Sequence, residues 1–83
     1  MEGQQIGKVT HYFPKAGVAV VELSHAVKTG DTVHIKGHTT DLKQEITSMQ
    51  IEHDKVEIAE PRQSIGMKVS EPVRANDLVY KTI

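Results

Sequence analysis

The sequence contains no cysteine, which excludes disulfide cross-links, thiolate zinc sites and cysteine nucleophiles. It has two tyrosines and one phenylalanine, too few for the stacking platform of a single-strand nucleic-acid-binding protein. It also lacks a basic excess, since 10 Lys and Arg residues face 11 Asp and Glu residues, which argues against free-standing DNA binding. The start has no signal peptide and no apolar run approaches roughly 20 residues, so we expect a cytoplasmic protein without membrane contact.

Leucine is scarce as well, with three residues against 17 valines and isoleucines. Because β-branched side chains fit pleated sheets better than helices, this composition predicts an all-β fold. The length of 83 residues corresponds to one small domain, spanning residues 1–83. A chain this short leaves little room for an enclosed active-site cavity.

Short segments of alternating apolar and polar residues lie between recurring turn signals. They predict strands at residues 6–12, 17–23, 32–37, 42–52, 55–59, 64–69 and 78–81, and one helical turn near residues 74–77. Within the longest segment, Ile46 and Met49 do not share the same alternation. We expect either a bulge near Thr47 and Ser48, which would fit a closed barrel, or an Ile46 side chain on the other face.

The segments VKTGDTVHIKG, QEITSMQ, VEIAEPRQSIGMKV and ANDLVYK follow one another in an order that resembles the second domain of elongation factor Tu. The resemblance covers residues 6–81 and implies a small closed Greek-key barrel of six or seven strands. Similar barrels also occur as free-standing proteins and at the C-terminus of collagenase-like peptidases, and this chain resembles the free-standing kind. The phosphate-binding loop of the GTPase domain is absent, so we expect no GTP.

The same resemblance implies a role for exposed basic and polar residues, because loops of this barrel contact ribosomal RNA in the family. Residues that would face RNA, the ribosome or a translation-related protein are Lys28, Lys36, His38, Lys43, Arg62 and Gln63. The alternative for the lysines is that they are solvated side chains that keep strand edges from pairing with other chains. The family's pocket for the aminoacyl end of tRNA is not reproduced, since Gln50, Ile51 and Glu52 follow Met49.

Neither metal binding nor catalysis is favoured by the remaining polar residues. On one strand His34 and His38 would lie about 13 Å apart, too far to share an ion. Only a sharp turn of the chain at Gly37 would let them converge with Asp41, so we expect no metal and no cofactor. A serine and a histidine lie near an aspartate in two places, which does not establish the geometry of a triad, and we expect no enzyme activity. The residues in question are Ser24, His25 and Asp31, and Ser48, His53 and Asp54.

Alternation cannot bury both Tyr12 and Phe13 on one face, so one ring is expected to be exposed, over a barrel end or as an anchor for a partner. These observations together predict a non-catalytic binding module, monomeric or weakly dimeric. It would contact RNA or a protein of the translation or RNA-modification machinery. The alternative is a protein–protein accessory module related to the peptidase-appended barrel, with no nucleic-acid contact.

Overall fold

The structure is a computed structural model that describes residues 3–52 and 54–82, and the described residues form ten strands and no helix. The described segments accordingly contain no helix that is suited to crossing a membrane. The strands are β1 (Gln4–Phe13), β2 (Val18–Leu23), β3 (Val27–Lys28), β4 (Thr32–Lys36), β5 (Asp41–Glu45), β6 (Met49–Ile51), β7 (Asp54–Val56), β8 (Ile58–Ala59), β9 (Ser64–Lys68) and β10 (Leu78–Lys81).

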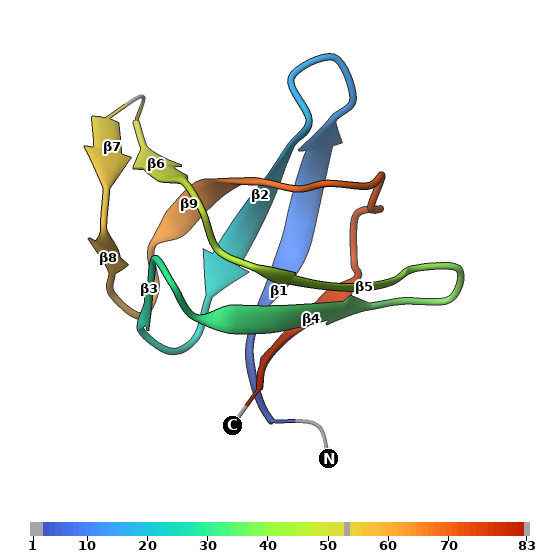
Figure 1. Cartoon of the computed structure of the whole chain (residues 1–83), viewed down its shortest axis with the longest axis horizontal. Coiled ribbons are helices and arrows are strands. Elements are labelled where there is room, and N and C mark those ends of the chain that lie inside the picture. Colours follow the sequence, from blue (N-terminus) through green and yellow to red (C-terminus); the bar gives the residue numbers. More distant parts are fainter. Residues whose placement is uncertain (1–2, 53, 83) are drawn as a thin grey trace.

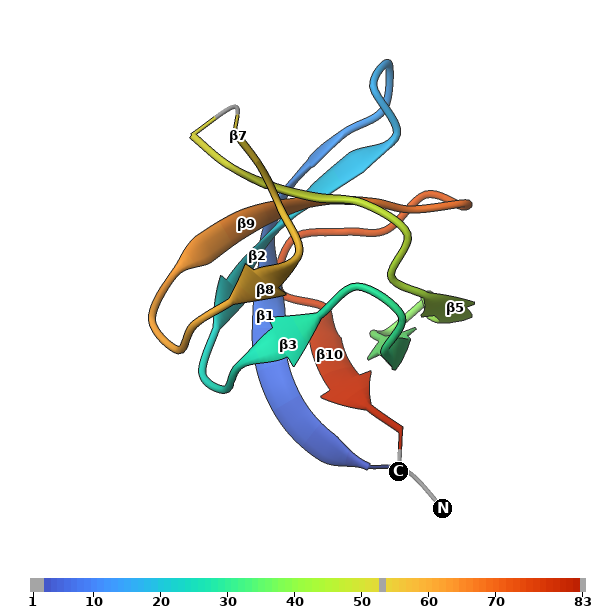
Figure 2. The same cartoon turned by 60° about the vertical axis from the view of Figure 1, so that its left-hand side comes forward.

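Eight of these strands form one antiparallel sheet with the order β5-β4-β10-β1-β2-β9-β6-β7, which curls into a half-barrel (Figure 1). The remaining two, β3 and β8, form a small antiparallel sheet beside it (Figure 2). The predicted all-β class is confirmed. The predicted closed barrel is wrong, because the large sheet has two free ends, at β5 and β7.

The half-barrel stays open because β5 and β9 form no ladder with each other. The chain leaves β5 after Glu45, and residues 46–48 carry it to β6, which pairs with β9 instead. The backbone of Ile46 bonds to the turn before β4, with its N–H donating to Asp31 O at 2.8 Å and its oxygen accepting from Gly30 N at 2.9 Å. A depression of about 370 Å³ remains between β5 and the end of β9.

The strands with clean alternation, β1, β2, β4, β9 and β10, have boundaries within two residues of the predicted ones. The predicted strand 42–52 is interrupted at residues 46–48, where a bulge was expected. Ile46 and Met49 are both buried in the same core, so the alternative of Ile46 on the other face is wrong. The predicted strand 55–59 is divided at Glu57 into β7 and β8, and β3 was not predicted.

Two bulges bend the long strand β1 and account for its irregular burial. The register shifts between Gln5 and Gly7 against β10, and between Val9 and His11 against β2. A bulge bends its strand and increases the local twist, so β1 can pair with β10 along its first half and with β2 along its second. This bend produces much of the curl of the sheet.

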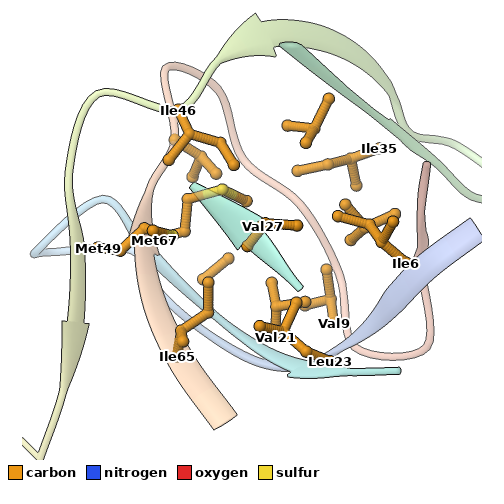
Figure 3. Close-up of a cluster of buried hydrophobic side chains, with 14 of the residues drawn as sticks. Ile6, Val9, Val21, Leu23, Val27, Ile35, Ile46, Met49, Ile65 and Met67 are labelled. Carbon is orange, nitrogen blue, oxygen red and sulfur yellow. The ribbon is translucent and has the colours of Figure 1, made fainter. Parts of the chain in front are cut away.

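Seventeen hydrophobic side chains fill the concave side of the half-barrel as one buried cluster. Figure 3 shows residues from β1, β2, β4, β6 and β9 pointing toward one another, with Val27 of β3 among them. Val27 is 2% exposed and Ala59 of β8 is fully buried. The small sheet therefore covers one side of the core. Contacts of Val27 and Ala59 with the core hold these two short strands in place.

Three turns share one hydrogen-bond geometry, at residues 28–31, 60–63 and 74–77. In each, the last residue donates its backbone N–H to the carbonyl of the first, over 3.1, 3.3 and 3.2 Å. In each, a side-chain oxygen of the last residue accepts from the backbone N–H of the first. The third residue has a positive φ, at Gly30, Arg62 and Asn76. The helical turn expected at residues 74–77 is therefore wrong, because the left-handed residue ends any helical path.

Candidate partner-binding surface

The six residues expected to contact a partner lie in two separate regions. Lys36, His38 and Lys43 belong to the hairpin of β4 and β5. Lys28 ends β3, while Arg62 and Gln63 lie in the turn between β8 and β9. β3 pairs with β8, so the second group surrounds the small sheet. The structure therefore does not bring the six residues into one patch, and RNA contact by either group stays a prediction.

The hairpin of β4 and β5 carries a mixed set of charges. His34 pairs with Asp41 across the hairpin, and this hydrogen bond lowers the pKa of Asp41 below that of an ordinary aspartate. The charge of Lys36 acts in the same direction. The exposed His38 lines a depression of about 240 Å³ together with Arg74 and residues 75–77. The β4–β5 hairpin thus balances two lysines, Lys36 and Lys43, against two carboxylates, Asp41 and Glu45, of which Asp41 is paired with His34.

The turn at residues 60–63 uses its polar side chain internally. Gln63 Oε1 accepts a hydrogen bond from the backbone N–H of Glu60 at 2.7 Å. Arg62 is exposed, and its backbone N–H donates to the carbonyl oxygen of Leu23 at 2.9 Å, which fixes the turn against β2. The side-chain oxygen of Gln63 therefore shapes the turn that presents Arg62, and contact of Gln63 with a partner stays a prediction.

An exposed apolar residue marks the small sheet. Ile58 of β8 is 63% exposed, although large aliphatic side chains usually lie in the core. It lines a depression of about 250 Å³ with residues from three other segments, and we call this set the Ile58 surface: Ala26, Val27, Lys28, Asp31, Ile58 and Lys81. In the predicted strand 55–59, Val56 and Ile58 alternate with Glu57 and were expected to share the buried apolar face. The interruption at Glu57 and the burial of Ala59 turn Ile58 outward instead.

The Ile58 surface carries one ion pair and one further cation. The Asp31 carboxylate accepts from the backbone N–H of Lys28 at 3.0 Å and lies 3.4 Å from the ammonium of Lys81. Residues 3–52 and 54–82 supply no ion-pair partner for the ammonium of Lys28. The surface therefore presents an apolar side chain beside one uncompensated positive charge.

A second exposed apolar residue lies at the tip of the hairpin of β1 and β2. Phe13 is 48% exposed, whereas Tyr12 packs against the core, so the prediction of one exposed ring is confirmed. The rings of His11 and Phe13 contact each other, with 4.5 Å between their centroids and a tilt of 54°. This tip lies at the top of Figure 1, and the start of β1 lies at the bottom.

The geometry around His25 is unsuited to activating a serine. His25 Nδ1 lies 3.1 Å from Ser24 Oγ, while its Nε2 lies 2.9 Å from the side-chain nitrogen of Gln4. An amide nitrogen donates, so in the neutral ring Nε2 accepts and the proton resides on Nδ1. A ring that donates to Ser24 cannot take the proton of that hydroxyl. The candidate His53 lies outside the described residues.

No group of three His, Asp or Glu side chains able to hold a metal ion occurs among the described residues. His34 is paired with Asp41, and His38 is exposed in the loop beyond β4. Three surfaces of the described structure are therefore candidates for function, namely the β4–β5 hairpin, the Ile58 surface and the tip at Phe13.

A search against protein-family models finds no match for the chain. Its fold is that of a small all-β domain found at the C-terminus of U32 peptidases and collagenase-like proteins. The crystal structure of the C-terminal domain of a Geobacillus thermoleovorans protein assigned to the U32 peptidases superimposes with a TM-score of 0.90. The match has 25% sequence identity and covers 96% of this chain and 93% of that domain.

Curated relatives agree with the structural match. The chain is 44% identical over 77 residues to an uncharacterized protease of Methanocaldococcus jannaschii, covering 92% of this chain and 19% of the relative. It is 36% identical over 78 residues to a collagenase of Porphyromonas gingivalis, covering 92% of this chain and 22% of the relative. The chain thus spans about a fifth of these relatives. The expected similarity to peptidase-appended domains is confirmed, while the resemblance to elongation factor Tu receives no support.

Proposed function

We propose that this domain is a non-catalytic accessory module of U32-type peptidases, acting through protein contacts alone. The observation that carries the proposal is the match of nearly the whole chain to an isolated C-terminal domain of such a protein. About four fifths of each curated relative lies outside the matched segment, which leaves ample room for a separate peptidase domain. The exposed Ile58 and Phe13 supply apolar contact points of the kind that anchor protein interfaces.

The RNA-binding interpretation has weaker support. The curated relatives reported above are named as a protease and a collagenase. The net charge of −1 also lacks the basic excess through which nucleic-acid-binding proteins gain affinity by releasing counterions. The basic residues named for RNA contact also lie in two separate regions. Neither region forms a continuous positively charged groove along which a phosphate backbone could bind. The protein-contact alternative is therefore the better supported of the two.

A chimera of the Porphyromonas gingivalis collagenase tests the proposal. In it, the 78 matched residues are replaced by the corresponding residues of this chain, and a second variant lacks them altogether. We expect the chimera to cleave collagen at a rate near that of the parent, the deletion variant to lose most of it, and the isolated 83-residue chain to cleave none.

Three results would contradict the proposal. Cleavage by the isolated chain would show a catalytic domain, and a folded chimera no better than a folded deletion variant would exclude the accessory role. Retention of RNA by the isolated chain at low salt, with steep loss as the salt concentration rises, would favour the RNA interpretation instead. Circular dichroism of every variant establishes that it is folded.

A further inference from the structure

We propose, resting on the proposed function, that the Ile58 surface is the face that docks the peptidase domain in U32-type proteins. The occupant is the peptidase domain itself, joined in the same chain or bound as a separate one. The tip at Phe13 remains outside this contact. Three features carry the inference, namely where the chain enters the domain, what the surface exposes, and its charge.

The chain enters the domain beside the Ile58 surface. Gln4 pairs with Lys81, which lines that surface, and Gln4 Nε2 bonds to His25, the residue before Ala26 of the same surface. Gly3 packs so closely on the backbone of Lys81 that a Cβ there would lie 2.6 Å from the carbonyl carbon. The first described residues are therefore held at the Ile58 surface.

The position of this entry determines which face lies nearest to a preceding domain. The matched domain of Geobacillus thermoleovorans is C-terminal, so the rest of that protein precedes it and connects at the end equivalent to the start of β1. In both Figure 1 and Figure 2 the start of β1 lies at the bottom and the tip at Phe13 lies at the top. A domain joined to the start of β1 thus lies on the side of the Ile58 surface and away from the tip at Phe13.

The chemistry of the surface defines what its partner must present. Covering the 63% of Ile58 that is exposed removes apolar area from water, which is the main favourable contribution to association. The ammonium of Lys28, which has no ion-pair partner within residues 3–52 and 54–82, then requires an opposing carboxylate, because a buried charge without a partner is unfavourable. We infer that the facing part of the peptidase domain is an apolar patch flanked by Asp or Glu.

Single cysteines provide the test, since the chain has none of its own. Ile58→Cys and Phe13→Cys are introduced separately into the isolated chain and into a chimera of the Methanocaldococcus jannaschii protease that carries this chain in place of its 77 matched residues. The rate of thiol labelling at each position is measured by mass spectrometry. Both positions are exposed in the isolated domain, so both thiols are accessible there, and each chimera is compared with the isolated chain that carries the same cysteine.

Labelling at Ile58→Cys should be at least roughly 10-fold slower in the chimera than in the isolated chain, which corresponds to docking worth about 1.4 kcal/mol after the Ile58 side chain has been replaced. Labelling at Phe13→Cys should be the same in both. Slowing at Phe13→Cys alone would overturn the docking face while leaving the accessory function intact. Equal rates at both positions would overturn it too, and collagen cleavage by the other chimera would then decide the proposed function separately.

Discussion

Gln44 Nε2 donates a hydrogen bond to the carbonyl oxygen of Lys68, with 2.8 Å between the two atoms. The amide oxygen of the same side chain accepts from the backbone N–H of Ser70 at 2.9 Å. One side chain therefore presents a donor and an acceptor to the chain at the end of β9, as a neighbouring strand would. These two bonds cross the gap between β5 and the end of β9, where the half-barrel is open, and we call this gap the seam.

Replacing Gln44 should measurably destabilise the fold. Gln44→Met keeps the length of the side chain but removes these two bonds to the backbone and a longer one from Ser70 Oγ at 3.3 Å. Each backbone bond is worth about 0.5–1.5 kcal/mol, so we expect a loss of about 1–3 kcal/mol in the free energy of unfolding. The control is Lys43→Met, at an exposed position of the same strand. Urea unfolding followed by circular dichroism measures both. Equal midpoints for the two variants would show that the seam bonds contribute nothing.

The seam also shows the limit of prediction from this sequence. Strands such as β4 were predictable because Val33 and Ile35 alternate with polar neighbours over a local window. The contact across the open seam joins Gln44 to Lys68, 24 residues apart, and no local pattern in the sequence marks that pairing. The Ile58 surface was missed for a related reason, since the direction of a two-residue strand depends on its partner β3.

The three similar turns were not recognised as equivalent in the sequence. Asp31, Gln63 and Asp77 each cap their own turn with a side-chain oxygen, yet Gln63 differs from the aspartates in type and length. The left-handed positions hold Gly, Arg and Asn, which share no chemical property. The three turns are therefore equivalent in backbone geometry and not in side-chain chemistry. This geometry predicts backbone strain at Arg62 and Asn76, which are not glycine, and none at Gly30.

Arg62 and Gly30 should respond oppositely to substitution. A non-glycine residue at positive φ costs about 1–2 kcal/mol, whereas glycine loses about 0.5–1 kcal/mol of extra chain entropy. Arg62→Gly, at φ 72°, should therefore stabilise the fold by about 0.5–1 kcal/mol. Gly30→Ala, at φ 96° with open space around it, should destabilise the fold by about 0.5–1 kcal/mol for the same reason. Thermal unfolding of both variants checks the signs, and a shift in the same direction would contradict this account.

Gly37 and Asp77 should be energetically coupled. A Cβ at Gly37 would lie 2.6 Å from Asp77 Cγ, and that carboxylate is 5% exposed and held by the backbone N–H of Arg74 at 2.8 Å. Because Asp77 cannot move aside without losing its bond, Gly37→Ala should cost about 1–3 kcal/mol. In the Asp77→Ala background the same change should cost less than about 0.5 kcal/mol. A double-mutant cycle by urea unfolding measures the coupling, and strictly additive losses would exclude it.

The pair of His34 and Asp41 should make stability depend on pH in the acid range. The hydrogen bond from His34 lowers the pKa of Asp41 in the folded state, so the pair stabilises the fold above the unfolded pKa of about 3.9. This contribution is lost as the pH falls through the lower folded pKa, because the protonated side chain then resembles asparagine.

The difference in unfolding free energy between the wild type and Asp41→Asn should accordingly shrink from about pH 5 to about pH 2, as measured by urea unfolding across that interval. Glu71→Gln, at an exposed position, controls for the change in net charge. A difference that stays constant across the interval would mean that the ionisation of Asp41 is not linked to folding.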